Sequence, residues 1–171
     1  MSGERLFFAM WPGPASAAAL AELARALAQA ADGRAVPAEK IHLTLAFLGS
    51  TPVERIASAR EAARLRAAAV DGAFDRVGSF RRAAVAWAGM SDPPAALLQL
   101  QAKLAARLAE RGFALEERPF TPHVTLARRI RRPVARAPIE SIAWEARELT
   151  LVRSETGTGR YTIMEAWPLG A

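Results

Sequence analysis

The chain contains two histidines, and both open the same short pattern. His42 begins the sequence His-Leu-Thr-Leu-Ala, and His123 begins His-Val-Thr-Leu-Ala. At the threonine and leucine frequencies of this chain, both histidines would be followed by Thr two residues on and Leu three residues on by chance in about two of 100,000 cases. The pattern therefore indicates a repeated functional element.

Strand periodicity places each histidine beside its threonine. Residues two apart in a β-strand share a face, so we expect Thr44 beside His42 and Thr125 beside His123, with the apolar residues between them on the other face. An imidazole accepts or donates a proton near neutral pH, and threonine hydroxyls donate hydrogen bonds to anionic oxygens. Two opposed His-Thr pairs therefore suit acid–base cleavage of a phosphodiester, in principle without a metal.

The composition excludes several other chemistries. The 171 residues include no cysteine, which rules out disulfides, thiolate nucleophiles and Cys-ligated metal centres. Two histidines cannot form a three-histidine metal site, and no closely spaced set of His, Asp and Glu is present. The net charge is +6, and 21 of the 23 basic residues are arginine. This excess favours an anionic substrate without establishing one.

Apolar segments do not indicate a membrane or secreted protein. The longest such stretch, residues 15–31, is interrupted by Glu22, Arg25 and Gln29. The apolar run at residues 6–11 is too short for a signal peptide and has no net positive flank. We therefore expect a cytoplasmic protein.

The predicted elements recur in the two halves of the chain. The first half predicts a strand at 6–10, a helix from Pro14 to Gly33, a strand at 41–48, a helix opened by a capping box at 51–54 and running to about Val70, and a strand at 73–80. The second half predicts a strand at 85–87, a helix from Asp92 to Gly112 and a strand at 123–126. The tail at 144–167 predicts two strands joined by a turn at 156–159.

The repeat and the length favour one domain, residues 1–171, made of two lobes that contain His42 and His123 respectively. We expect an α+β fold in which two mainly antiparallel sheets face a central cleft and the helices pack outside.

The paired motifs also support a family resemblance. With the segments Arg5-Leu6-Phe7-Phe8-Ala9, residues 41–49, residues 118–128 and residues 151–154 before Tyr161, the chain resembles the 2H phosphoesterase superfamily. It is most similar to the RNA 2′,3′-cyclic phosphodiesterases, also called 2′-5′ RNA ligase-like proteins. The resemblance implies a bilobed fold and hydrolysis of a 2′,3′-cyclic phosphate at an RNA end to a 2′-phosphate. It also implies His42 as proton donor to the 3′ oxygen, His123 as proton acceptor that activates water, and Thr44 and Thr125 as phosphate-holding residues.

Arg128 follows the second motif and, by the same resemblance, should lie near the phosphate. Strict alternation places Arg128 on the face opposite His123, so it reaches the cleft only if the strand ends or bulges there. Further arginines and aromatics are candidates for RNA contact. We expect Arg129, Arg131, Arg132 and Arg136 to steer RNA from a solvent-facing loop, and Phe7, Phe47 and Phe120 to pack in the core or to stack on a base.

Several alternatives stay open at this point. The motifs are nearly symmetric, so the residues alone do not assign the acid and the base. The same histidines could join RNA ends by a 2′-5′ linkage, if an RNA 5′-hydroxyl replaces water. Two further hypotheses are a non-catalytic module that binds RNA or a nucleotide, and a metal hydrolase with two histidines and a carboxylate. We expect RNA ends or cyclic nucleotides as substrates, no cofactor or metal, no membrane partner and a monomer.

Overall fold

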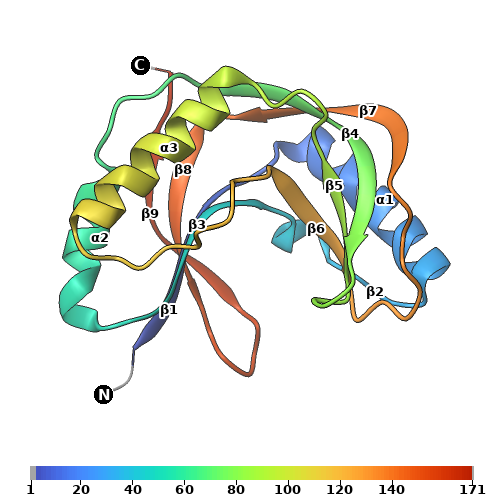
Figure 1. Cartoon of the computed structure of the whole chain (residues 1–171), viewed down its shortest axis with the longest axis horizontal. Helices are drawn as coiled ribbons and strands as arrows, with labels where there is room; N and C mark the ends of the chain where they lie inside the picture. Colours follow the sequence, from blue (N-terminus) through green and yellow to red (C-terminus); the bar gives the residue numbers. More distant parts are fainter. Residues whose placement is uncertain (1–2, 171) are drawn as a thin grey trace.

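The computed structural model describes residues 3–170, which form an α+β fold with three α-helices and nine strands (Figure 1). All strand pairs are antiparallel. In chain order the elements are β1 (Glu4–Met10), α1 (Pro14–Ala31), β2 (Arg34–Ala35), η1 (Ala38–Lys40), β3 (Leu43–Thr51), η2 (Val53–Arg55), α2 (Ile56–Ala63), β4 (Val70–Phe80), β5 (Val85–Gly89), α3 (Ala95–Glu110), β6 (His123–Arg128), β7 (Ala137–Ala146), β8 (Glu148–Ser154) and β9 (Tyr161–Pro168).

The strand order is symmetric about the centre of the sheet. It runs β7-β4-β5-β6-β3-β1-β8-β9, with the short β2 added on β6. The motif strands β3 and β6 are central, and each is flanked by an earlier strand from its own half of the chain, β3 by β1 and β6 by β5. The final strands β8 and β9 return to β1. The N-terminal and C-terminal segments therefore close the same half of the sheet.

The predicted α+β class and the antiparallel pairing are confirmed, but the prediction of two separate sheets is wrong. All nine strands belong to one sheet. Its two halves meet where β3 pairs with β6 at Leu43 and Val124. Both residues are fully buried, so the junction is apolar on the face that the helices cover.

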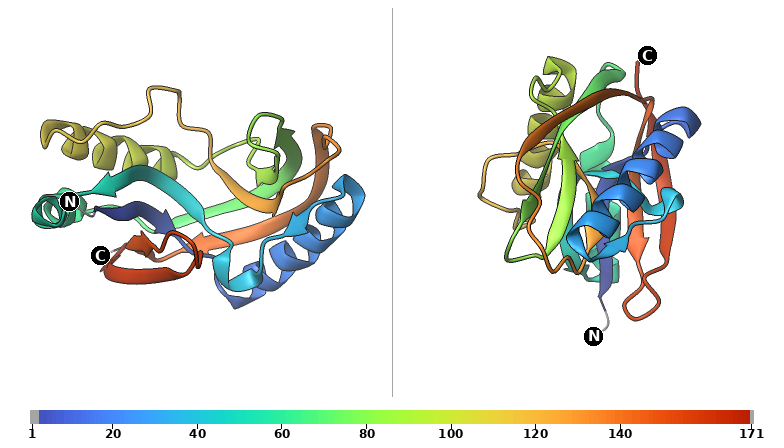
Figure 2. Two further views of the ribbon diagram at one scale, coloured as in Figure 1. Left: turned by 90° about the horizontal axis from the view of Figure 1, so that it is seen from below. Right: turned by 90° about the vertical axis from the view of Figure 1, so that its right-hand side faces the viewer.

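The helices bury their predicted leucine stripes on one face of the sheet. Leu97, Leu100, Leu104 and Leu108 of α3 and Leu20 of α1 are 0% exposed and share a single core cluster with Leu43 and Val124. Burying one such side chain contributes about 1.5–3 kcal/mol. Helix α1 packs mainly on β6, whereas α3 contacts α2 and β3. Both figures accordingly show α2 and α3 at one end of the sheet and α1 at the other (Figures 1 and 2).

A second, smaller cluster lies on the other face of the sheet. It consists of Phe7, Ala9 and Val152, with Trp11 and Tyr161 packed against it. The neighbouring β1 residues, Leu6 and Phe8, belong instead to the main core. Side chains alternate along a strand, so Phe7 and Ala9 point away from the helices. We call this surface the site face.

The second helix is shorter than predicted. The capping box does not form, because Thr51 is the last residue of β3 and its hydroxyl donates a hydrogen bond to the carbonyl of Gly49. A 3-10 turn at η2 follows, and α2 ends at Ala63 instead of near Val70. Tertiary contacts set this end, because the Arg107 guanidinium of α3 donates to the carbonyls of Ala62 and Glu61.

The C-terminal region contains one strand more than predicted. Strands β8 and β9 and their turn at 156–159 follow the expectation, with Gly157 and Gly159 at positive φ. However, Trp144, where the first of the two predicted strands was expected to begin, belongs to β7, a ten-residue strand that begins at Ala137 and pairs with β4. The short β2 was not predicted either. Within residues 3–170 no helix is long and apolar enough to cross a membrane.

Two arginines cap the C-termini of neighbouring helices reciprocally. While Arg107 of α3 caps α2, Arg55 before α2 donates to the carbonyls of Arg111 and Gly112 at the end of α3. The Arg55 guanidinium also lies 4.2 Å from the centroid of the Phe113 ring. Helix-terminal carbonyls without partners are costly, and a basic side chain satisfies them favourably.

We predict that Arg55→Met lowers the free energy of unfolding by about 1–2 kcal/mol, because carbonyls at the end of α3 lose a charged donor. Urea denaturation measures this change. Arg66→Met is the matched control, since Arg66 is exposed and makes no hydrogen bond or ion pair within the described part of the chain. Equal stability of the two variants would contradict the capping role.

Candidate active site

The junction between β3 and β6 brings the two motifs together. Leu43 pairs with Val124, and antiparallel register continued by one residue in each direction places His42 opposite Thr125 and Thr44 opposite His123. Leu43 and Val124 face the helices, so the histidines and threonines project from the site face. All four polar side chains are half-buried. The structure therefore gathers the four predicted residues around the centre of the sheet.

Both imidazoles are held in the same way by the backbone. The Nδ1 atom of His42 lies 2.7 Å from the carbonyl oxygen of Lys40, and Nδ1 of His123 lies 2.8 Å from that of Thr121. A carbonyl can only accept, so each Nδ1 carries a hydrogen and donates it. The neutral rings then have Nε2 as their proton-accepting atom, and a protonated ring donates from Nε2. Each motif thus fixes its tautomer through the residue two positions before the histidine.

Aromatic side chains enclose His42. Its ring stacks on Phe7 with centroids 4.9 Å apart and lies 5.1 Å from Trp11, while Tyr161 meets it edge-on at 5.4 Å. Trp11 is fixed in turn, because its indole nitrogen donates to the buried Thr150 hydroxyl at 2.9 Å. These contacts restrict rotation of the His42 ring and shield part of it from water.

Lys40 connects the aromatic side chains around His42 to the β8–β9 turn. Its carbonyl accepts the His42 hydrogen bond, and its ammonium donates to the carbonyl of Gly159 at 2.7 Å. The same ammonium lies 5.4 Å from the centroid of Tyr161. From the sequence, Tyr161 served only to locate the segment 151–154, and no contact of Tyr161, Lys40 or Trp11 with His42 was predicted. The alternation of Phe7, Ala9 and Trp11 along one face of the first strand could have indicated Trp11.

His123 has a different aromatic environment. Phe80 meets its ring edge-on at 5.3 Å and packs on Trp87 at 5.6 Å. Trp87 lies across two glycines: a Cβ on Gly78 would collide with its ring, and a Cβ on Gly89 would come within 2.9 Å of it. These glycines allow a large indole to lie flat beside Thr125, its strand partner. The contact between Phe80 and His123 was not predicted.

A β-bulge decides where Arg128 lies. Ala86 pairs with Ala127, but the next β5 residue, Trp87, pairs with Thr125, so Leu126 is an extra residue in β6. Leu126 and Ala127 are consequently both fully buried in the main core, and Arg128 is exposed. The bulge reverses the alternation and turns Arg128 toward the face of Thr125. The strand therefore bulges just before Arg128, which was the condition for this side chain to reach the face of the histidines.

The first motif carries the same irregularity. Phe8 pairs with Ala46 and Ala9 with Thr44, which leaves Leu45 as the extra residue in β3. Phe47 then takes the place in its motif that Arg128 takes in the other, and it is 51% exposed. The Arg5 guanidinium lies 5.5 Å from its ring centroid.

The three candidate aromatics therefore differ. Phe7 is buried against His42, Phe120 is half-buried and packs on the main core, and Phe47 is open to a ligand.

The electrostatic environment distinguishes His42. Burial lowers the pKa of His42 below its ordinary value, and the positive charges of Arg128 and His123 lower it further, while the hydrogen bond to the Lys40 carbonyl opposes the shift. The free protein therefore favours neutral His42. Arg128 lies close enough to this ring to act on its charge, although it belongs to the strand of the other motif.

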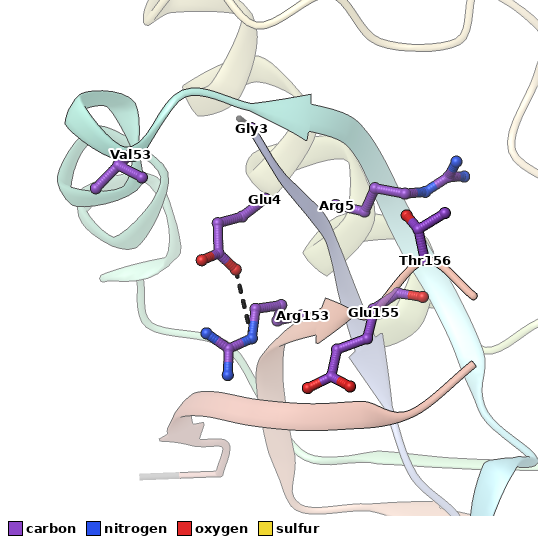
Figure 3. Close-up of a pocket in the computed structure, with 8 residues that line it drawn as sticks. Gly3, Glu4, Arg5, Val53, Arg153, Glu155 and Thr156 are labelled. Atoms are coloured by element: carbon purple, nitrogen blue, oxygen red, sulfur yellow. Dashed lines mark ion pairs between the residues drawn. The ribbon is translucent and has the colours of Figure 1, made fainter. Parts of the chain in front are cut away.

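A pocket of about 430 Å³ lies elsewhere, where β1 begins and β8 ends (Figure 3). It is lined by Gly3, Glu4, Arg5, Val53 and residues 153–156, and an ion pair of 3.3 Å joins Glu4 to Arg153. Neither histidine lines it, so it is separate from the chemistry described above. Among residues 3–170, no group of three or more His, Asp or Glu side chains is placed to hold a metal ion.

We predict that Arg128→Gln raises the pKa of His42, because the variant removes a positive charge that disfavours the imidazolium. The measurement is a pH titration of the ring resonances by NMR, which is simple because the chain has two histidines. His123→Ala assigns the signals. Arg132→Gln is the control, since Arg132 is exposed and is not among the groups that shift His42. An unchanged His42 titration in Arg128→Gln would contradict the proximity of the two groups.

Comparisons with known proteins agree on one family. The sequence pattern described as the 2′-5′ RNA ligase superfamily matches residues 12–158. The RNA 2′,3′-cyclic phosphodiesterase of Escherichia coli (strain K12) is 37% identical over 142 residues, 80% of this chain and 80% of that protein. The RNA 2′,3′-cyclic phosphodiesterase of Thermus thermophilus is 31% identical over 183 residues, 96% and 90% of the two chains. A crystal structure of E. coli LigT complexed with 3′-AMP has a TM-score of 0.85 at 33% identity, with 99% of each chain covered.

Proposed function

This chain belongs to the 2′-5′ RNA ligase superfamily, and we propose that it hydrolyses RNA 2′,3′-cyclic phosphodiester ends to 2′-phosphomonoesters. The observation that carries the proposal is the pair of backbone-anchored histidines on one face. Each has an Nε2 without a hydrogen-bond partner among residues 3–170 and a threonine across the strand junction. Two relatives at 31–37% identity are RNA 2′,3′-cyclic phosphodiesterases, and a similar structure contains 3′-AMP.

In the proposed reaction His123 is the base and His42 is the acid. Neutral His123 takes a proton from water through Nε2, and the water oxygen attacks phosphorus. The bond from phosphorus to the 3′ oxygen breaks, and protonated His42 gives that oxygen its proton. The products are a 3′-hydroxyl and a 2′-phosphate, and no metal or cofactor takes part.

The threonines and Arg128 act on the phosphate charge. Thr44 and Thr125 donate hydrogen bonds to the non-bridging oxygens, and Arg128 pairs with the same anion. This anion also explains how His42, whose pKa is lowered in the free protein, can act as an acid. A phosphate between Arg128 and His42 offsets the arginine charge, so substrate binding raises the pKa of His42 and favours the protonated form that the acid role requires.

Further sequence predictions enter the proposal. The symmetric strand order supports one domain, residues 1–171, of two lobes related by an internal repeat around His42 and His123. A monomer and a cytoplasmic location stay predictions from the sequence.

A second candidate reaction is 2′-5′ ligation, which the family match favours: an RNA 5′-hydroxyl replaces water as the group that His123 deprotonates.

We predict that an oligonucleotide with a 2′,3′-cyclic end, incubated with the protein and a chelator, yields a 2′-phosphate. His42→Ala and His123→Ala should each lower kcat by about 10²–10⁴-fold, because each removes one proton-transfer group. Chromatography against 2′- and 3′-phosphate standards identifies the product, and binding of the oligonucleotide should stay measurable in both variants.

The other outcomes identify the competing hypotheses. A 3′-phosphate reverses the regiochemistry and the histidine roles, and a 2′-5′-linked product with a 5′-hydroxyl acceptor indicates ligation. Binding without turnover indicates a non-catalytic module. Activity lost in chelator and restored by a divalent cation indicates a metal hydrolase.

The pH profile tests whether both imidazoles take part in the reaction. We predict a bell-shaped dependence of kcat/KM on pH, because one imidazole must be neutral and the other protonated. The limb that moves to higher pH in Arg128→Gln is the one that the pKa of His42 sets, because the variant removes a positive charge that lowers this pKa. Arg132→Gln should leave both limbs in place. Movement of neither limb in Arg128→Gln would contradict the participation of His42, and a profile flat from about pH 5 to 9 would contradict the histidine pair.

A further inference from the structure

Six exposed arginines gather at the end of the sheet where β6 finishes. They come from three segments that are far apart in the sequence: β2, the turn between β4 and β5, and the loop between β6 and β7. We call this surface the arginine end, and its members are Arg34, Arg81, Arg82, Arg129, Arg131 and Arg132.

Backbone contacts hold the three segments together. The amide of Ile130 donates to the carbonyl of Ala84 at 3.1 Å, which joins the β6–β7 loop to the β4–β5 turn. The amides of Arg131 and Arg132 donate to the Ala31 carbonyl at the end of α1, at 2.9 and 3.0 Å. Arg34 of β2 pairs with Arg128. Figure 1 shows β2, this turn and this loop at one end of the molecule.

Little of this positive charge is neutralised by carboxylates within the described residues. Within the described residues, Arg131 is the one member at ion-pair distance from a carboxylate, that of Asp32, at 3.6 Å between largely exposed side chains. An exposed pair of this kind contributes at most about 1 kcal/mol, and the remaining like charges repel one another. A surface that concentrates positive charge without internal partners fits an external polyanion.

The arginine end is continuous with the active site. Arg128, which acts on His42, pairs with Arg34 in the adjoining strand. On the other side, the Arg136 guanidinium lies 5.9 Å from the centroid of Trp87, the strand partner of Thr125. A strand whose terminal phosphate lies between the two histidines can therefore extend over Arg128 and Arg136 onto the arginine end.

We propose that the arginine end binds the backbone phosphates of the RNA strand that precedes the reacting cyclic end. This inference rests on the proposed function, which supplies the RNA terminus, and adds a subsite for the body of the substrate. Phosphate contacts by arginine position a strand without reading its sequence, and they release counterions, so binding at this subsite is sequence-independent and salt-sensitive.

Two substrates that share one reacting end test the subsite. We compare a 2′,3′-cyclic mononucleotide with a single-stranded oligonucleotide that carries the same cyclic end, using Arg81→Gln/Arg82→Gln and Arg129→Gln/Arg132→Gln. Each variant should lower kcat/KM for the oligonucleotide about tenfold through KM and change that for the mononucleotide less than about twofold. The logarithm of the association constant for the oligonucleotide falls linearly with the logarithm of the salt concentration. The magnitude of this slope should decrease by about 1.4 in each variant, because two phosphate contacts are lost.

Arg25→Gln/Arg66→Gln is the control, because it removes the same charge from exposed positions outside the arginine end. An equal loss in this control, or equal losses for the two substrates, would overturn the subsite. If the wild-type protein hydrolyses neither substrate, the proposed function fails. Fluorescence anisotropy with a 3′-phosphorylated oligonucleotide still decides the subsite in that case: weaker binding in the arginine-end variants alone supports it, and unchanged binding refutes it.

Discussion

The site depends on one strand junction, the pairing of Leu43 with Val124. Both side chains are fully buried, and α1 and α3 pack on β6 and β3 beneath them. This apolar anchor keeps the two motif strands in one register, and that register sets each histidine opposite the threonine of the other motif. A slip by one residue would send the polar side chains into the core, where unpaired hydroxyl and imidazole groups are costly.

The two halves supply similar histidines in unequal surroundings. Each imidazole donates from Nδ1 to a carbonyl two residues earlier, so the tautomer is a local property of the motif. Beyond this point the halves diverge, because corresponding bulges present Phe47 in one motif and Arg128 in the other. Arg128 then acts on His42 across the junction. A nearly symmetric scaffold can thereby place two similar histidines in different surroundings, of which that of His42 lowers its pKa.

The sequence predicted the main helices, the motif strands and the α+β class, because leucine spacing and apolar runs report burial locally. It failed where distant residues decide. Helix α2 ends early because Arg107 of α3 caps it, and β7 is longer than its apolar pattern because β4 supplies its hydrogen bonds. The single sheet likewise depends on one residue pair between β3 and β6, a contact that neither motif reveals alone.

The sequence by itself determined the chemistry available to this protein: two histidines, each followed two residues later by a threonine, no cysteine and an excess of arginine. Residue type and strand periodicity are properties of the local chain, so the pairing of His42 with Thr44 and of His123 with Thr125 on one face could be read directly. The tertiary structure alone decided that Arg128 turns toward the site, that Tyr161 and Trp11 enclose His42, and that arginines from three segments share one surface. These outcomes depend on a bulge, on strand order and on loop contacts between residues far apart in sequence, whose energies exist only when the chain is folded.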